Sequence, residues 1–363
     1  MINRRGFGKA LGLGTGAAAV SLTGLPTARA ASPAPVRTAT APGISTSGPA
    51  PSSAAAATPG TRPTFPRIKQ VRAGLLNVGY AELGPARGPA VICLHGWPYD
   101  IHSYIDVAPL LADAGYRVIV PYLRGHGTTR FLSGRTFRNG QQAAVALDVI
   151  ALMDALKIEK AVLAGFDWGS RTADIIAALR PDRCKALVSV SGYLVTNVEA
   201  NQKPLSPRAE HTWWYQYYFA TERGRLAMED AKLRHDLTRF VWETVSPTWD
   251  FDDATFERTA AAFANPDYAA VVIHNYRWRL GLADGERRYD ALEKRLAARP
   301  VIGVPTITLD PERDPFTAPG NGAAYRDRFT GAYEHRTLTG IGHNLPQEAP
   351  GAFARAVIDV DGF

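Results

Sequence analysis

The sequence of 363 residues has only two cysteines, Cys93 and Cys184, so a framework of disulfides cannot hold its fold together. Each cysteine lies beside a run of residues typical of a β-strand, which favours two buried free thiols. A single disulfide would need an oxidising compartment. The core must therefore come from hydrophobic packing, for which a hydrophobic content of 46% is ample.

Long hydrophobic runs and a strong charge excess are also missing. No stretch reaches the ~18 continuous apolar residues of a membrane span, so we expect no stable span in the mature chain. The formal net charge is +7, but Arg4, Arg5, Lys9 and Arg29 supply four of these charges, and the remaining +3 belongs to residues 31–363. Such a small, dispersed excess argues against a nucleic-acid partner.

The N-terminus has the pattern of a targeting signal. Residues 1–30 begin with a basic segment, NRRGFGK, continue with an Ala/Gly-rich run and end in Ala-Arg-Ala. This predicts a removable signal peptide, and the paired arginines resemble a twin-arginine export motif. Residues 31–66 are rich in Ala, Pro, Ser and Thr, which predicts a disordered linker. We therefore expect an exported protein, either periplasmic or secreted.

From residue 67 onward, apolar strand-like runs alternate with helical patterns. This alternation predicts an α/β fold with a mostly parallel sheet and helices on both faces. The pattern is interrupted at residues 197–297, which are helical and rich in aromatic side chains. We predict a core formed by residues 67–196 and 298–363, with residues 197–297 inserted as a helical cap over the ends of the strands.

The segment AGFDWGS places Asp167 at a turn from a strand to a helix, between Gly165 and Gly169. Two glycines in the frame G-x-D-x-G allow the sharp elbow on which hydrolases with the frame G-x-S-x-G hold a nucleophile. The alternative is that Asp167 only caps the following helix.

Two further segments complete a catalytic set. GIGHNLPQEAP presents His343 in a glycine-rich loop, and the chain order nucleophile, acid, histidine is that of the same hydrolase fold. VPTITLDPERDPF offers three acids after a strand, of which Asp314 is our first choice to orient the histidine and Asp310 and Glu312 are alternatives.

The segment HGWP follows the third strand. Its position predicts that the backbone N–H groups of Trp97 and Trp168 form an oxyanion hole. No cluster of metal ligands or phosphate-binding loop is evident in the sequence, and the chemistry requires no cofactor.

A carboxylate nucleophile suits a saturated carbon that carries a leaving group, because the product is an alkyl ester that water can hydrolyse. With an acyl carbon it would instead form an anhydride. Epoxides and alkyl halides both fit. We expect a small apolar epoxide or halide as substrate, with water as the second reactant.

The segments HGWP, GFDWGS and GIGHNLPQEAP resemble the α/β-hydrolases with an aspartate nucleophile, and soluble-type epoxide hydrolases most of all. The resemblance covers roughly residues 67–363. It implies that two tyrosines of the cap protonate the epoxide oxygen, and it places Tyr215 and Tyr276 in that role, with Gln216 as a neighbour that binds substrate. A phenol is suited to this role because it stays protonated at neutral pH.

Two other functions remain open. A haloalkane dehalogenase would share Asp167, His343 and Trp168, whose indole N–H could bind halide, and would not need the tyrosines. A non-catalytic binding protein of the same fold would not need the intact nucleophile and base.

Overall fold

The computed structural model describes residues 64–65, 67–316 and 322–363. The predicted signal peptide (1–30) and nearly all of the predicted linker (31–66) lie outside this part. Phe65, which the prediction assigned to the linker, has its ring centroid 5.8 Å from that of His102. The contacts of the folded chain therefore begin before residue 67.

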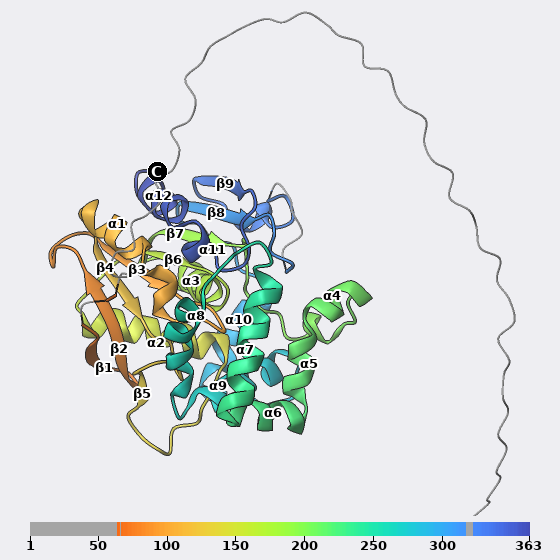
Figure 1. Ribbon diagram of the computed structural model, residues 1–363. Helices are drawn as coiled ribbons and strands as arrows, with labels where there is room; N and C mark the ends of the chain where they lie inside the picture. The colour runs from red at the N-terminus through yellow and green to blue at the C-terminus, as the bar shows by residue number, and fades with distance from the viewer. Residues whose placement is uncertain (1–63, 66, 317–321) are drawn as a thin grey trace, which may run out of the picture. The chain divides into compact units, whose positions relative to one another are not determined.

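In the described part of the chain, nine strands form one sheet (Figure 1). Its order is β1-β2-β4-β3-β6-β7-β8-β9, and β5 pairs with β2. Pairings that involve β2 are antiparallel, and the pairings from β4 to β9 are parallel. The strands are β1 (Lys69–Ala73), β2 (Leu76–Leu83), β3 (Ala90–Leu94), β4 (Arg117–Pro121), β5 (Arg130–Phe131), β6 (Ala161–Gly165), β7 (Cys184–Val190), β8 (Thr306–Pro311) and β9 (Tyr333–Leu338).

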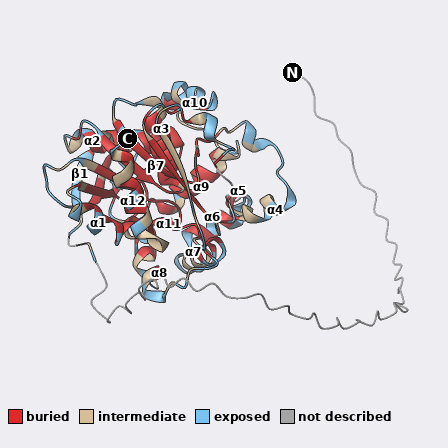
Figure 2. Cartoon of the chain, turned by 90° about the horizontal axis from the view of Figure 1, so that it is seen from above, coloured by how far each residue is buried: buried red, intermediate tan, exposed pale blue. Residues whose placement is uncertain are grey.

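Helices cover both faces of this sheet. The helices α2 (Gln142–Ala155) and α3 (Trp168–Leu179) pack against each other on one side, and α1 (Val107–Asp113) and α12 (Pro350–Asp361) pack on the other (Figure 2). All five residues of β6 are buried, as expected for a central parallel strand that reads as a continuous apolar run. The predicted fold class is confirmed.

Helices occupy much of the chain between β7 and β8. They are α4 (Pro207–Thr212), α5 (Trp214–Ala220), α6 (Glu222–Glu229), α7 (Ala231–Val245), α8 (Asp253–Ala260), α9 (Tyr268–Arg279), α10 (Asp290–Ala297) and three short 3₁₀ turns, Ala200–Gln202, Ala261–Ala264 and Arg287–Tyr289. We call this segment the helical insertion. It is tied to the rest of the protein: Trp242 of α7 donates its indole N–H to the Pro98 carbonyl at 2.8 Å.

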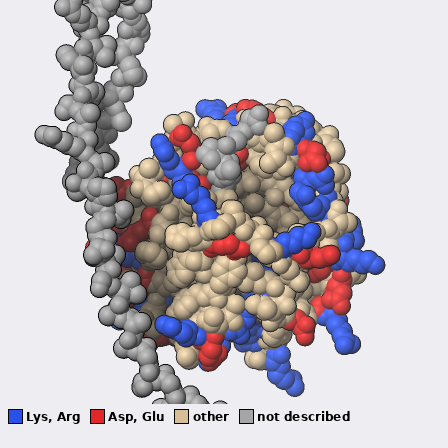
Figure 3. All heavy atoms as spheres, turned by 90° about the vertical axis from the view of Figure 1, so that its right-hand side faces the viewer, with Lys and Arg blue, Asp and Glu red and all other residues tan. Residues whose placement is uncertain are grey.

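Three shorter elements complete the described chain, namely the 3₁₀ turns Ile101–Tyr104 and Arg326–Arg328 and helix α11 (Leu345–Glu348). Both cysteines are buried and unpaired. Acidic and basic side chains are interspersed over the face drawn in Figure 3. Among the described residues, no helix has the length and hydropathy needed to cross a membrane.

Candidate active site

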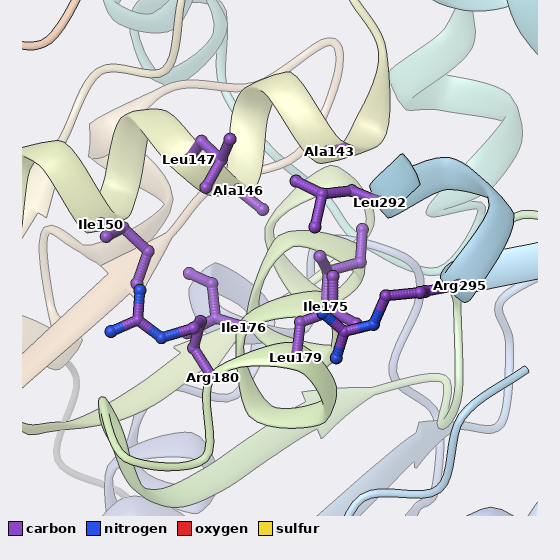
Figure 4. A pocket seen from close by; sticks show the side chains of 10 residues that line it. All are labelled: Ala143, Ala146, Leu147, Ile150, Ile175, Ile176, Leu179, Arg180, Leu292 and Arg295. Carbon is purple, nitrogen blue, oxygen red and sulfur yellow. The ribbon is translucent and has the colours of Figure 1, made fainter. Parts of the chain in front are cut away.

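Two cavities differ in whether their lining includes side chains that can act as a nucleophile or a base. One, of about 160 Å³, lies between α2, α3 and α10 (Figure 4). Its lining is aliphatic apart from two arginines, so it offers neither a nucleophile nor a base. It is lined by Ala143, Ala146, Leu147, Ile150, Ile175, Ile176, Leu179, Arg180, Leu292 and Arg295. The other, of about 240 Å³, is lined by Asp167, Asp314 and His343 among others, and we call it the acid–base cavity.

Asp167 occupies a strained elbow between β6 and α3. Its φ is +51°, a left-handed conformation that is unusual for a residue other than glycine. A Cβ on Gly169 would lie 1.8 Å from the Leu94 carbonyl oxygen, and one on Gly165 would lie 2.4 Å from the Gly169 carbonyl carbon. Both flanking glycines are therefore needed for this turn. The side chain of Asp167 makes no capping hydrogen bond to α3, contrary to the alternative in which it only caps that helix.

A backbone donor holds one oxygen of this carboxylate. The N–H of Trp97 donates to Asp167 Oδ1 at 2.8 Å. The approach is so close that a Cβ on Gly96 would lie 2.6 Å from the Cβ of Asp167. Trp168 is the first residue of α3, so its N–H belongs to the helix N-terminus, where backbone donors have no partner within the helix. The residues predicted to form an oxyanion hole thus flank the carboxylate.

His343 lies between two carboxylates. Its Nδ1 is 2.7 Å from Asp314 Oδ2, and its Nε2 is 3.8 Å from Asp167 Oδ2. The other oxygen of Asp314 accepts the Phe316 N–H at 2.9 Å, so this buried acid is held in place. Because Asp314 fixes the Nδ1 side, Nε2 faces the elbow.

The two alternative acids bind elsewhere. Asp310 accepts the phenol of Tyr325 at 2.6 Å, and its other oxygen lies 3.7 Å from His335 Nε2. Glu312 accepts the N–H of Gly340 at 2.9 Å. Of the three candidates at the end of β8, only Asp314 has a carboxylate at hydrogen-bond distance from His343 in the described structure.

The opposite charges of His343 and its two neighbouring carboxylates stabilise each other. Burial lowers the pKa of His343, but the charge of Asp314, the hydrogen bond to Asp314 and the nearby carboxylate of Asp167 outweigh it and bring the pKa to about 10. Burial raises the pKa of Asp167, but His343, the charge of Arg171 and the Trp97 N–H together hold it below its usual value. Asp167 is therefore ionised at neutral pH, as a nucleophile must be.

Tyr215 and Tyr276 are packed together beside the elbow. Their ring centroids lie 5.4 Å apart, and the Trp97 ring lies 5.3 Å from Tyr215 and 5.2 Å from Tyr276. Burial and the nearby charge of Asp167 raise the pKa of Tyr276, and burial, Tyr276 and Asp167 raise that of Tyr215. Both phenols remain protonated at neutral pH. Within the described residues, neither tyrosine is part of the lining of the acid–base cavity.

Gln216 does not line that cavity either. It lines a neighbouring cavity of about 240 Å³, which shares Asn201, Trp213 and Arg279 with the acid–base cavity. Two residues that the sequence analysis missed, Arg171 and Arg279, do line the acid–base cavity. Each has a signal in the sequence, because Arg171 follows Asp167 by four positions and Arg279 follows Tyr276 by three, which places each pair on one helix face. Among the described residues, no group of three or more His, Cys, Asp or Glu side chains could hold a metal ion.

Comparison with known proteins places this site in a family context. Residues 89–340 match the model of a family described as the alpha/beta hydrolase fold. Epoxide hydrolase B of Mycobacterium tuberculosis is 31% identical over 163 residues, which cover 41% of this chain and 44% of that protein. A haloalkane dehalogenase of Mycobacterium marinum is 30% identical over 216 residues, which cover 56% of this chain and 67% of that protein. The match thus spans less than half the length of the tuberculosis enzyme.

A solved structure is more similar. The crystal structure of a candidate epoxide hydrolase from Klebsiella pneumoniae subsp. pneumoniae has a TM-score of 0.80 and 58% sequence identity. The match covers 82% of this chain and 98% of that one.

Proposed function

The chain belongs to the α/β-hydrolase fold family, and from that premise we propose that it hydrolyses an epoxide to a vicinal diol through a covalent ester on Asp167. The resemblance to proteins named epoxide hydrolases supports this proposal. The observation that carries it is the Asp167 carboxylate on the elbow, 3.8 Å from His343 Nε2, with a pair of buried tyrosines beside it.

The two oxygens of Asp167 have different roles in this mechanism. Oδ1 accepts the Trp97 N–H, so Oδ2 is the better nucleophile. Oδ2 attacks a ring carbon of the epoxide, and the bond from that carbon to the ring oxygen breaks. The ring oxygen takes a proton from Tyr215 or Tyr276. The products of this step are an alkyl ester on Asp167, a hydroxyl group and a tyrosinate.

Water then hydrolyses the ester. His343 Nε2 takes a proton from water, and the resulting hydroxide attacks the carboxyl carbon of Asp167. Oδ1 becomes the oxyanion and already faces the Trp97 N–H, so stabilising its charge needs no reorganisation. Collapse of this intermediate releases the diol alkoxide, which takes the proton from His343, and leaves Asp167 as a carboxylic acid. Asp167 then returns its proton to His343, and the tyrosinate takes back, through water, the proton that His343 lost after ester formation, so that every group regains its resting state.

Ester formation also prepares the base. Resting His343 has a pKa of about 10 and is protonated at neutral pH, when it cannot accept a proton. The charge of Asp167 is one cause of that high value, and esterification removes the charge. The pKa of His343 therefore falls once the first step is complete, when a base is needed.

A haloalkane dehalogenase is the second candidate, and one observation favours it. Trp168 Nε1 is buried and has no hydrogen-bond partner among the described residues, so it could donate to a halide. The tyrosine pair favours the epoxide, because a departing halide needs no proton. Diol release from styrene oxide and bromide release from a bromoalkane separate the two activities. If neither styrene oxide nor the bromoalkane were turned over and a small apolar ligand bound tightly, a non-catalytic binding protein would be favoured.

The experiment that tests the ester is a single turnover in heavy-oxygen water with enzyme in excess over epoxide. Label should enter the carboxyl group of Asp167, because one of its oxygens leaves with the diol. His343→Gln should accumulate an adduct on the peptide that contains Asp167, and Asp167→Asn should accumulate none. Label that enters the diol directly, or an adduct on another residue, would refute the mechanism.

A further inference from the structure

The acid–base cavity contains more positive charge than an epoxide requires. Besides Asp167, Asp314 and His343, its lining includes Arg171 and Arg279. The remaining lining is polar or aromatic as well as aliphatic: Ser191, Tyr193, Leu194, Val195, Thr196, Asn197, Asn201, Trp213 and Phe316. A site for a purely apolar substrate would be lined mostly by hydrophobic side chains, with few polar groups.

Arg171 lies one helical turn beyond the nucleophile on α3. Only 7% of the residue is exposed, and its Nε donates to the Leu194 carbonyl at 3.2 Å. It forms no ion pair with a described residue, although a buried cation is costly unless paired. Its nearby negative charge is that of Asp167, which the ester would neutralise.

Arg279, the last residue of α9, lines the same cavity. Its guanidinium carbon lies 5.7 Å from the ring centroids of both Trp213 and Tyr276. Its Nε is buried and has no hydrogen-bond partner among the described residues. Burial and the charge of Arg279 lower the pKa of Arg171 to about 10, so the two cations are close enough to repel each other.

Two arginines that face one small cavity, with donors left over, are suited to an anion. A carboxylate would accept hydrogen bonds from both and relieve their repulsion. We propose that Arg171 and Arg279 form a carboxylate-binding subsite, and that the substrate is a small epoxide with a carboxylate close to its ring. This proposal rests on the proposed function. The sequence analysis predicted an apolar substrate, whereas these two residues favour an anionic one.

Position and volume limit the substrate further. Arg171 is four residues from Asp167, and Arg279 is three residues from Tyr276, so the subsite lies about one helical turn, roughly 5 Å, from the reacting groups. The cavity volume of about 240 Å³ is below the range of roughly 300–1,000 Å³ typical of sites for drug-sized ligands. An oxirane carboxylate substituted with a short side chain fits both limits.

The test compares a charged epoxide with a neutral one of the same shape. Oxirane-2-carboxylate and its amide are supplied to the wild type, to Arg279→Met and to Arg171→Lys. The wild type should prefer the carboxylate in kcat/KM. Arg279→Met should lower kcat/KM for the carboxylate by about tenfold or more, the loss expected for one charge-assisted hydrogen bond, and for the amide by less than about threefold. Arg208→Met, an exposed arginine of α4, is the matched control and should change neither.

A binding measurement separates this proposal from the proposed function. Cyclopropanecarboxylate, which cannot react, should bind Asp167→Asn in calorimetry, and Arg279→Met in that background should weaken binding about tenfold or more. Arg171→Lys, which keeps the charge in a buried position, should weaken binding without unfolding the protein. If the wild type turned over no epoxide but carboxylate binding were intact, only the proposed function would be overturned. If the wild type turned over neutral epoxides but Arg279→Met lowered kcat/KM equally for the carboxylate and the amide, only the subsite would be overturned.

Discussion

Asp314 accepts a hydrogen bond from His343 Nδ1 at 2.7 Å, while its second oxygen is fixed by the backbone of Phe316. The first prediction follows from this hydrogen bond between Asp314 and His343. In Asp314→Asn the amide would donate to Nδ1 and leave the proton on Nε2, so His343 could no longer accept a proton from water. We expect hydrolysis of the ester to slow by about 10³–10⁴-fold. Formation of the ester should slow much less, because attack by Asp167 needs no base.

Rapid-quench single turnovers, which follow the ester and the diol separately, measure both steps. Asp310→Asn is the matched control, since Asp310 hydrogen-bonds to Tyr325 and not to His343. It should lower thermal stability and leave the hydrolysis rate within about threefold of the wild type. If Asp310→Asn slowed hydrolysis as much as Asp314→Asn, the assignment of the acid would be wrong.

The choice among these acids shows where sequence reasoning stops. Asp310 lies in the last two residues of β8 and Glu312 and Asp314 follow it, and the sequence pattern alone does not say which side chain reaches His343. The contact depends on how the loop after β8 turns back toward residues 339–344, which is a tertiary property. By contrast, Asp167 could be placed on an elbow because Gly165 and Gly169 are required locally by the turn itself.

Two other features escaped the sequence analysis for physical reasons. Strand β9, with the sequence YEHRTL, is partly exposed and polar, and it forms through backbone pairing with β8 rather than through an apolar pattern of its own. Arg171 and Arg279 were overlooked because a single arginine on a helix normally faces solvent. The spacing to Asp167 and Tyr276 was the available signal. The roles of Tyr215, Tyr276 and Gln216 stay predictions.

The second prediction concerns the pKa of His343. The charge of Asp167 helps to raise this pKa to about 10, so Asp167→Asn, which mimics the uncharged ester, should lower it by more than one unit. Because His343 acts as a base, the rate of ester hydrolysis should rise with pH and reach a plateau above the lowered pKa. Histidine NMR titration of the wild type and of Asp167→Asn measures the shift. An unchanged pKa would contradict the idea that the first step activates the base.

The third prediction concerns the two tyrosines. Tyr215→Phe and Tyr276→Phe each remove one proton donor beside Asp167, and the double variant should slow ester formation from an epoxide by about 10²–10⁴-fold. Ester formation from a bromoalkane needs no proton and should change little. Stopped-flow measurement of both reactions provides the comparison. The control is Tyr217→Phe, because Tyr217 is exposed and lies on α5 with Tyr215. Equal losses with both substrates would assign the tyrosines to packing rather than to proton donation.

The fourth prediction concerns stability. Asp174 on α3 is fully buried, and its Oδ2 accepts the Leu194 N–H at 2.7 Å. Burial raises its pKa to about 7, against the effects of that N–H and of the charge of Arg171. Between pH 4 and 7 the folded state therefore holds a proton that the unfolded chain has lost. The contribution of Asp174 to the free energy of unfolding therefore falls as pH rises through this window, by on the order of 4 kcal/mol.

Asp174→Asn removes the titrating group and keeps an oxygen that can accept the Leu194 N–H. Its free energy of unfolding should fall less steeply than that of the wild type between pH 4 and 7, so the variant should be the more stable protein at pH 8. Urea unfolding at several pH values measures both slopes. Asp113→Asn removes the same charge from an exposed position and should leave the wild-type slope unchanged. If Asp174→Asn and the wild type had parallel profiles, Asp174 would be ionised in the folded protein despite its burial, and its neighbour Arg171 would then have a second negative partner besides Asp167.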